Sequence, residues 1–489
     1  ATIPRSIKIL QLKVISYPLP AVDSENCMSI LQRIKVTKAR KATPTNDGNA
    51  PKNRRLFFAV IRLAFGLWLR PKFRMHSENE SVLRNTRPPF LVLPNHVGFW
   101  DPFLVGLKLP GQIHYIVADS NFRNPILRFL LTYIDAIPKT KSRSDMDSVR
   151  KMMSVRDHGG VICLFPEGRR TWDGRSLPPI QSTAKLVKLL KIPVIVPVLE
   201  GMYLSNPCWA TKVRPGPITI RFHRLFDGPE LRGMSSDEIY EAMRSILDYD
   251  EHATQYHRRR RYKGSRRAEY LERVLHTCPA CGEIGNMESH VHTLRCTACG
   301  HTVQLNDQGF FEAVSGPVYF SDPGAWNKWQ IQTLDSYIRS NETDHYERPL
   351  FSDSGIQLSI GWRAKPLEHV GFGTMRCYTD RVEFLCRRPT KAFRHPEGRF
   401  SGVEYLSTEQ GLLLVFPLNE IVGWNVQNKE HFEWYHHHML FRVRRPDNRF
   451  SGYKWYSTIN LLLGRHPQAA HIARHEIADA DLPGEHSLP

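Results

Sequence analysis

Two short segments of the chain combine residue types that can move a proton or hold an anion. In FLVLPNHVGFWDP, His96 follows an apolar run, and Asp101 comes five residues later, directly before Pro102. A neutral imidazole can take a proton from an alcohol near neutral pH, and a carboxylate on its other nitrogen fixes the tautomer and stabilises the imidazolium. At about 100° per residue this spacing does not share a helical face, so the pair would meet across a strand-to-helix turn. The pattern predicts a hydroxyl-activating dyad.

The spacing of the dyad could also arise by chance, or Asp101 could have a purely structural role. A histidine followed five residues later by an aspartate also occurs at His114 and Asp119, inside the strand-like run QIHYIVAD, where no turn signal accompanies it. We interpret that second copy as accidental. Asp101 and Pro102 would also suit a helix N-cap followed by proline at the first helical position, with no chemistry attached.

The segment GVICLFPEGRRTWDG also ends an apolar run in a polar turn. It places Glu167, Gly168, Arg169 and Arg170 at the same edge of the predicted sheet as His96. Adjacent guanidinium groups beside a glycine, which exposes backbone N–H groups, suit the recognition of a phosphate. A solvated turn is the alternative for the two arginines.

Together these segments resemble the glycerolipid acyltransferase family, whose type member is lysophosphatidic acid acyltransferase. Three ordered blocks over roughly residues 55–250 carry the resemblance. The NHxxxxDP block matches His96 and Asp101, the FPEGxR block matches Phe165, Pro166, Glu167, Gly168 and Arg170, and a later apolar block, IPVIVPV, contains Pro197.

The resemblance implies that His96 is the base that deprotonates a glycerol hydroxyl and that Asp101 is its orienting partner. The hydroxyl would attack the thioester of acyl-CoA or acyl-carrier protein directly, with no acyl-enzyme. Glu167, Gly168 and Arg170 would shape the site for the acceptor's phosphate. The implied acceptor is a lysophospholipid, foremost 1-acyl-sn-glycerol-3-phosphate, and the product is phosphatidic acid.

Two departures from the family pattern bear on specificity. Gly98 stands where the family often has a serine, two places after the histidine. The block that usually ends in arginine reads AIPKTKSRSD, so Lys141 or Arg143 would have to replace that arginine. Because lysine is a point charge and not a planar fork, strict specificity for a lysophosphatidic acid phosphate is in doubt.

The elements that must position these residues alternate between two patterns. Short β-like runs at 90–94, 112–118, 160–166, 192–198 and 218–226 are separated by helix-like periods. One such helix should end at Gly159-Gly160, and another should begin with the capping box Ser235-x-x-Glu238. The alternation predicts an α/β fold with a largely parallel sheet. The resemblance implies that this is an acyltransferase-type layered domain.

Four cysteines have the spacing of a zinc ribbon. Cys278 and Cys281 form one Cys-x-x-Cys pair, and Cys296 and Cys299 form a second pair after fourteen intervening residues. Four thiolates close a tetrahedral site and leave no position for a reactive water, so we expect structural Zn²⁺. The pairs also favour metal binding in a reducing compartment over a disulfide framework, which suggests the cytoplasm.

The C-terminal part is rich in β-branched and aromatic residues and predicts a small β-rich domain, faintly similar to pleckstrin-homology domains. Within it, PEGRFSGVEYLST (396–408) and PDNRFSGYKWYST (446–458) echo each other, and we interpret both as turns between strands. The predicted order is a basic, loosely ordered arm (1–52), the acyltransferase domain (53–250), a basic linker or helix (251–275), the zinc ribbon (276–305), a linker with a tryptophan pair (306–349), the β-rich domain (350–465) and a tail (466–489).

Charge and hydropathy bear on where the protein works. Residues 33–55 and 251–275 contribute twelve of the net nineteen positive charges, and such strips attract an anionic membrane surface or nucleic acid, unless they are only solvated segments. The run RLFFAVIRLAFGLWLRPKF is too short and too charged to span a membrane but fits an interfacial helix; packing on the domain's own core is the alternative. No secretory signal is recognised at the beginning of the sequence.

These features predict a peripheral membrane acyltransferase of the bacterial phospholipid-synthesis type, on the cytoplasmic face of the membrane. A rival hypothesis is a zinc-ribbon protein that binds nucleic acid, or a membrane-docking scaffold, with a degenerate acyltransferase layer. The retained reactive residues disfavour nucleic acid as the partner.

Overall fold

The computed structural model describes residues 52–69, 71–139, 146–340, 348–362, 366–390, 393, 405–427, 429–437 and 439–464. The predicted arm before residue 52 and the predicted tail after residue 465 lie outside the described residues.

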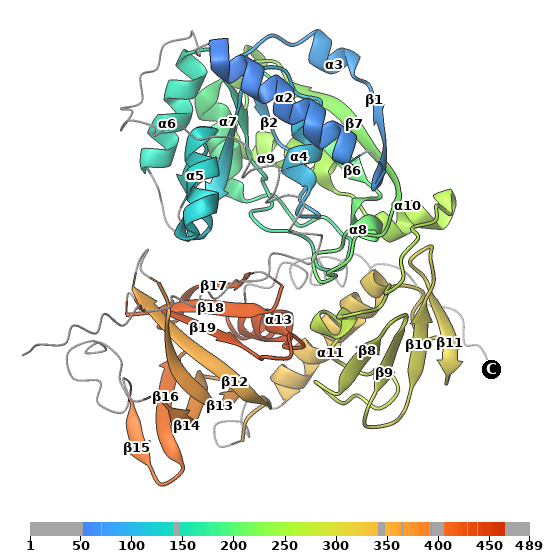
Figure 1. The fold of residues 1–489 in the computed structure, drawn as a ribbon, viewed down its shortest axis with the longest axis vertical. Coiled ribbons are helices and arrows are strands. Elements are labelled where there is room, and N and C mark those ends of the chain that lie inside the picture. The colour runs from blue at the N-terminus through green and yellow to red at the C-terminus, as the bar shows by residue number, and fades with distance from the viewer. Residues whose placement is uncertain are drawn as a thin grey trace, which may run out of the picture. The chain divides into compact units, whose positions relative to one another are not determined.

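A seven-stranded sheet forms the centre of the N-terminal part (Figure 1). Its order is β1-β7-β6-β2-β5-β3-β4, and every neighbouring pair is parallel except β6 and β7. This confirms the predicted α/β fold with a largely parallel sheet. The strands are β1 (Phe73–Glu78), β2 (Phe90–Val92), β3 (Ile113–Ala118), β4 (Ile137–Lys139), β5 (Val161–Cys163), β6 (Val194–Glu200) and β7 (Gly216–Phe226).

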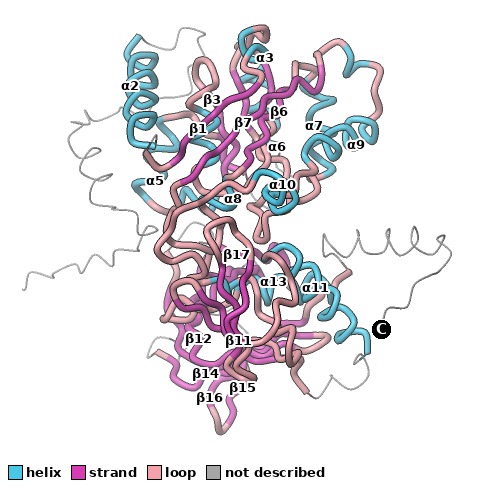
Figure 2. Tube along the Cα trace, turned by 90° about the vertical axis from the view of Figure 1, so that its right-hand side faces the viewer, coloured by secondary structure: helices cyan, strands magenta, loops and turns pink. Residues whose placement is uncertain are grey.

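Helices cover both faces of this sheet because its central strands β2, β5 and β6 are buried on both sides. Figure 2 shows α2 on one side of β1, β7 and β6, with α7 and α9 on the other. The helices of this part are α2 (Lys52–Leu69), α3 (Ser81–Arg84), α4 (Asp101–Gly106), α5 (Pro125–Tyr133), α6 (Met146–Asp157), α7 (Gln181–Leu190), α8 (Met202–Ser205), α9 (Ser236–Leu247) and α10 (Glu251–Arg258), with 3₁₀ turns η1 (Asp119–Arg123) and η2 (Glu230–Arg232).

The alternation of strand side chains divides the hydrophobic core in two. Phe90 and Val92 of β2 join a cluster with residues of α2, α4 and α8, whereas Leu91 joins a cluster with residues of α6, α7 and α9. Successive side chains of a strand point to opposite faces, so one short apolar run serves both clusters. The strand that carries the dyad segment is thereby buried on both sides.

The cysteine-rich part forms a second, antiparallel sheet in the order β11-β10-β9-β8. Its strands are β8 (Met287–His290), β9 (Thr293–Cys296), β10 (Thr302–Leu305) and β11 (Phe311–Ser315), and the 3₁₀ turn η3 (Leu271–Arg273) precedes them. Residues 306–349, expected as a linker, contain β11 and the helix α11 (Pro323–Ser340). Trp326 of α11 is buried, because α11 packs into the large core cluster of the C-terminal part.

The β-rich part is an antiparallel sheet in the order β15-β16-β14-β13-β12-β19-β18-β17. The strands are β12 (Phe351–Trp362), β13 (Glu368–Cys377), β14 (Arg381–Pro389), β15 (Leu406–Thr408), β16 (Gly411–Pro417), β17 (Val422–Gln427), β18 (His431–His436) and β19 (Met439–Arg444), followed by α13 (Gly452–Leu462). Along the chain, β12 is the first of these strands and β19 is the last. They pair with each other and so connect the strands β12 to β16 with the strands β17 to β19.

The echo between 396–408 and 446–458 was interpreted wrongly for its second copy. Residues 446–458 do not turn between two strands but lead into α13, whose N-cap Ser451 accepts a hydrogen bond from the N–H of Lys454. A Ser-Gly pair suits a helix start as well as a turn, and the apolar residues that follow decide between them. Most of the first copy lies outside the described residues.

Candidate active site

The two reactive segments leave the sheet side by side. β2 and β5 are parallel neighbours, with Val92 opposite Cys163, and both chains run out of the sheet at their carboxyl ends. His96 and Glu167 each follow four residues after these paired positions. The carboxyl edge of a parallel sheet is where α/β proteins hold their ligands, and here it brings together two segments that are 71 residues apart.

The predicted dyad is formed. His96 Nδ1 lies 2.9 Å from Asp101 Oδ2, and the same oxygen accepts the backbone N–H groups of Val97 at 2.6 Å and Gly98 at 2.9 Å. Asp101 is fully buried, whereas the side chain of His96 is 21% exposed. The carboxylate is therefore fixed by three donors, and the imidazole can be reached from solvent.

The other histidine with the same spacing lies inside a strand, as its sequence context suggested. His114 lies within β3, and its Nδ1 is 3.3 Å from the backbone oxygen of Asp135. This contact runs to the loop before β4, away from Asp119.

Glu167 contacts the backbone of the dyad segment. Its Oε1 accepts the backbone N–H of His96 at 2.7 Å and its Oε2 accepts the N–H of Leu177 at 2.9 Å. Burial raises the pKa of Glu167 to about 8, the two backbone N–H groups oppose that rise, and the charge of Asp101 adds to it. Glu167 thus holds His96 and the segment 165–180, which we term the FPEG loop, in one arrangement.

Both glycines of the site occupy positions that a side chain would disturb. Gly168 has φ +70°, and a Cβ there would lie 2.6 Å from Ile180 Cδ1. A Cβ on Gly98 would lie 2.5 Å from Met202 Cε and 3.2 Å from the backbone oxygen of Asn206. Glycine at position 98, where the family often has serine, therefore allows the dyad turn to pack closely against α8.

The two arginines of the FPEG loop have different surroundings. Arg169 stacks its guanidinium carbon 4.0 Å from the ring centre of Tyr456 on α13. Arg170 is half-buried near Cys208, where its charge opposes the burial that raises the pKa of that thiol to about 12. The assignment of Arg170 to an anion site, made from its place in the motif, stays a prediction.

Another cation, Lys429, lies near Arg170 and was not predicted. Lys429 follows β17, and its ammonium group donates to the backbone oxygen of Ala210. Burial lowers the pKa of Lys429 to about 7, and the charges of Arg170 and Arg273 lower it further. A bound anion would relieve this repulsion. No local pattern could have identified Lys429, because Ala210 and Arg170 lie more than two hundred residues earlier in the chain.

Lys141, the expected substitute for the family's arginine, lies outside the described residues, as does Arg143. The structure therefore does not place them relative to His96.

The helix α2 has one packed face and one exposed face. Phe65 stacks on Phe103 with ring centres 5.4 Å apart, and Trp68 meets Trp100 edge-on at 5.1 Å. The exposed face carries apolar side chains that are 56 to 66% accessible, Val60, Leu63 and Leu67. The packed face agrees with packing on the domain's own core, and the interfacial helix stays a prediction. Among the described residues, no helix combines the length and apolar character needed to cross a membrane.

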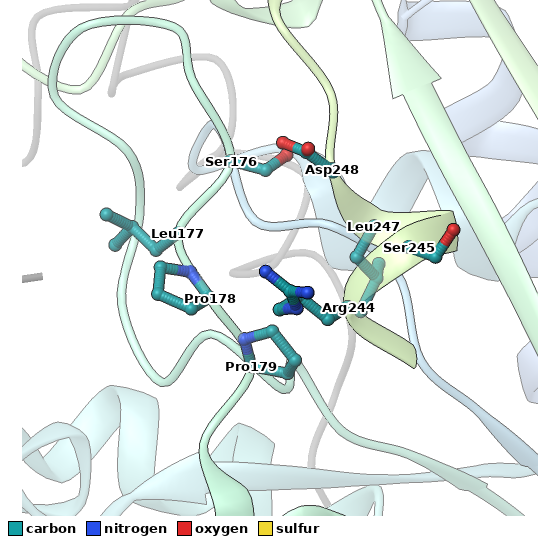
Figure 3. A pocket seen from close by; sticks show the side chains of 8 residues that line it. All are labelled: Ser176, Leu177, Pro178, Pro179, Arg244, Ser245, Leu247 and Asp248. Atoms are coloured by element: carbon teal, nitrogen blue, oxygen red, sulfur yellow. The ribbon is translucent and has the colours of Figure 1, made fainter. Parts of the chain in front are cut away.

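A pocket lined in part by the FPEG loop contains neither member of the dyad. It is lined by Ser176, Leu177, Pro178, Pro179, Arg244, Ser245, Leu247 and Asp248 (Figure 3). Figure 3 shows Arg244 of α9 facing the two prolines. Leu177 links this pocket to Glu167 through its N–H.

The four predicted metal ligands converge. Cys278 Sγ lies 3.7 Å from Cys299 Sγ, Cys281 Sγ lies 3.8 Å from Cys296 Sγ, and all four sulfurs lie within 4.8 Å of one another. Zinc–sulfur bonds of about 2.3 Å in a tetrahedron place sulfurs about 3.8 Å apart. The group is therefore positioned to bind a metal ion.

One part of the chain is similar to a known protein family. Residues 74–199, which hold both reactive segments, match the family described as Acyltransferase. This part of the chain is an acyltransferase domain, which confirms the predicted family.

The relatives with curated names are 1-acyl-sn-glycerol-3-phosphate acyltransferases. The Bacillus subtilis protein is 25% identical over 113 residues, which cover 23% of this chain and 56% of the relative. The chloroplastic LPAT1 of Arabidopsis thaliana is 24% identical over 127 residues, 26% of this chain and 35% of the relative. The chain thus spans about a third to just over half of these relatives. A crystal structure titled as the 1-acyl-sn-glycerophosphate (LPA) acyltransferase PlsC from Thermotoga maritima aligns over 43% of this chain and 85% of that chain, with 16% identity and a TM-score of 0.35.

Proposed function

We propose that this protein transfers an acyl group from acyl-CoA or acyl-carrier protein to the hydroxyl of a lysophospholipid. The foremost acceptor is 1-acyl-sn-glycerol-3-phosphate, which would give phosphatidic acid. The observation that carries the proposal is the contact of 2.9 Å between His96 Nδ1 and a buried Asp101 carboxylate at the carboxyl edge of the sheet. Homology to 1-acyl-sn-glycerol-3-phosphate acyltransferases supports the choice of reaction.

The chemistry follows from the arrangement of the dyad. With Nδ1 held by Asp101, Nε2 of His96 takes the proton of the acceptor hydroxyl as its oxygen attacks the thioester carbonyl. The tetrahedral intermediate collapses, the carbon–sulfur bond breaks, and the imidazolium returns the proton to the departing thiolate. Asp101 stabilises the imidazolium while it exists. No covalent acyl-enzyme is needed.

The acceptor's phosphate is assigned to the FPEG loop. Arg170 provides the guanidinium, Gly168 gives the backbone its left-handed turn, and Glu167 positions the loop against His96. Lys141 is the additional cation expected from the sequence. An arginine can hold a phosphate through two parallel hydrogen bonds, which fixes the hydroxyl relative to the base.

The lipid substrates imply that the enzyme works at an anionic membrane surface, on its cytoplasmic face. The exposed apolar face of α2 supports this placement, because such a face can enter the headgroup region. The β-rich domain, proposed to be pleckstrin-homology-like, and the metal-binding part would then assist docking. Zn²⁺ is the proposed ion of the four-cysteine site, and its role is structural.

The decisive experiment measures transfer of a labelled acyl group from acyl-CoA to lysophosphatidic acid on anionic vesicles. We expect His96→Ala to abolish transfer while leaving the fold intact, and His114→Ala, which removes the histidine of the accidental copy, to retain activity. Near-wild-type turnover by His96→Ala would refute the assigned base. If the wild type transfers nothing, with acyl-carrier protein and other lysolipids also tried, the scaffold hypothesis gains support.

A further inference from the structure

A group of potential metal ligands lies in the β-rich domain, away from the four cysteines. Glu420 belongs to the loop between β16 and β17, and His436 and His437 lie where β18 ends. Nε2 of His436 is 2.9 Å from Glu420 Oε2, and Nε2 of His437 is 3.1 Å from the same oxygen. Two imidazole nitrogens thus converge on one carboxylate oxygen.

The backbone makes this convergence possible. Successive side chains of a strand point to opposite faces, so His436 and His437 would normally diverge. His437 instead adopts φ +45°, in the left-handed region that residues other than glycine rarely occupy. The two rings consequently lie on the same side, with their centres 4.0 Å apart.

The three side chains are held in place to different degrees. His436 is 7% exposed, and its ring packs edge-on against Phe416 with centres 5.4 Å apart. The N–H of Glu420 donates to the backbone oxygen of Pro417 at 3.0 Å, which fixes the start of its loop. The side chains of Glu420 and His437 are 41% and 52% exposed, so an ion could enter from solvent.

We propose that Glu420, His436 and His437 form a second metal site, which takes a first-row divalent transition ion such as Zn²⁺. Imidazole nitrogen with one carboxylate oxygen suits such ions, whereas Ca²⁺ and Mg²⁺ prefer oxygen ligands alone. Ligand atoms at about 2.1 Å from a tetrahedral ion lie about 3.4 Å apart. Each histidine nitrogen therefore needs to move only a few tenths of an ångström away from the Glu420 oxygen. Three protein ligands leave a position for water, so this site differs from the closed four-cysteine site.

Such an ion would link two connections of the same sheet. The loop that carries Glu420 joins β16 to β17, and the turn that carries His437 joins β18 to β19. The proposal does not depend on the acyltransferase activity, because all three ligands belong to the β-rich domain. The alternative is that both imidazoles only donate hydrogen bonds to the carboxylate.

The test is the metal content of the full chain after dialysis against buffered Zn²⁺. We expect about two ions per wild-type chain and about one in Glu420→Gln combined with His437→Gly, since the four cysteines keep theirs. Glycine relieves the left-handed backbone at position 437, so this variant should fold as well as the wild type. The matched control, Glu409→Gln with His257→Ala, removes an exposed acid and an exposed histidine elsewhere and should keep about two ions.

A spectroscopic measurement distinguishes specific from general surface binding. With Zn²⁺ in the four-cysteine site, added Co²⁺ should give ligand-field absorption without a thiolate charge-transfer band, and this absorption should be lost in the double variant. One ion per wild-type chain would overturn the proposal. Equal loss of the second ion, or equal Co²⁺ absorption, in the control and the ligand variant would overturn it too.

Discussion

Asp101 is fixed by three hydrogen-bond donors, His96 Nδ1 and the N–H groups of Val97 and Gly98, all of which converge on one oxygen. We expect Asp101→Asn to preserve the turn, because the amide oxygen can still accept the backbone groups. The amide cannot stabilise an imidazolium and can favour the wrong tautomer, so kcat should fall by a factor on the order of 10² to 10⁴. Steady-state kinetics alongside circular dichroism checks this; a tenfold or smaller loss would contradict the orienting role.

Glu167 predicts how stability depends on pH. Burial raises its pKa to about 8, against roughly 4.3 in an unfolded chain. Between these values the folded protein holds a proton that the unfolded chain has lost, so this contribution to stability is complete below about pH 4.3 and is lost as the pH rises through about 8.

Glu167→Gln removes this titration. Relative to the variant, the wild type should lose up to about 1.4 kcal/mol of unfolding free energy per pH unit within that window. Denaturant unfolding of both proteins at about pH 5.5 and about pH 7.5 measures the difference, and comparison with the variant cancels the other titrating groups. A difference that does not change with pH would mean that Glu167 is ionised in the folded state.

At the scale of elements, the four-cysteine site predicts the effect of removing its metal. Two of the ligands, Cys278 and Cys281, precede β8, whereas Cys296 is the last residue of β9 and Cys299 follows it. Chelation should therefore loosen β8, β9 and β10 and increase their amide exchange, since the site is closed by four thiolates. The dyad belongs to another sheet, so the chemical step should survive. Immediate and fully reversible loss of transfer, with the fold unchanged, would argue for a catalytic metal.

The helix α9 shows how far local patterns can define an element. The box predicted from Ser235 and Glu238 is present, since Ser235 Oγ accepts the N–H of Glu238 at 3.1 Å and Glu238 Oε2 accepts the N–H of Ser235 at 2.6 Å. The strands at 90–94, 112–118, 160–166, 192–198 and 218–226 were also recognised, but β1 and β4 were not. Both are edge strands with mixed polarity, and they lack the apolar run that identifies a buried strand.

At the scale of the whole molecule, the FPEG loop contacts residues far along the chain. Trp172 packs on Tyr453 with ring centres 5.3 Å apart. Asn327 of α11 is fully buried and donates to Asp173 Oδ2 at 2.8 Å and to the hydroxyl of Tyr453 at 3.0 Å. Together with Arg169 and Tyr456, these contacts connect the loop that carries Arg170 to α11 and α13.

These contacts predict that Asn327→Ala loosens the FPEG loop from a distance. Loss of the buried amide leaves Asp173 with fewer hydrogen bonds, so we expect a destabilisation of about 1–3 kcal/mol and faster amide exchange in residues 165–180. Lys328→Ala, at the exposed neighbouring position on α11, should change neither. If faster exchange in the Asn327 variant were confined to α11, the loop would not depend on this contact.

Local sequence indicated the candidate reactive groups and the elements that carry them. An apolar run that ends in a polar turn defines a buried strand with its ligands at one edge, so His96, Asp101 and the FPEG loop could be identified without a structure. The same holds for the four cysteines, because Cys-x-x-Cys pairs are set by local chain geometry.

Only the tertiary structure decided what surrounds those groups. It showed that Glu167 braces the backbone of His96, that Lys429 lies near Arg170, and that Asn327 reaches Asp173 across 154 residues of sequence. It also brought Glu420 to two histidines that a regular strand would direct to opposite faces. Such contacts arise from the packing of distant segments, and no periodicity or spacing along the chain encodes which segments will meet.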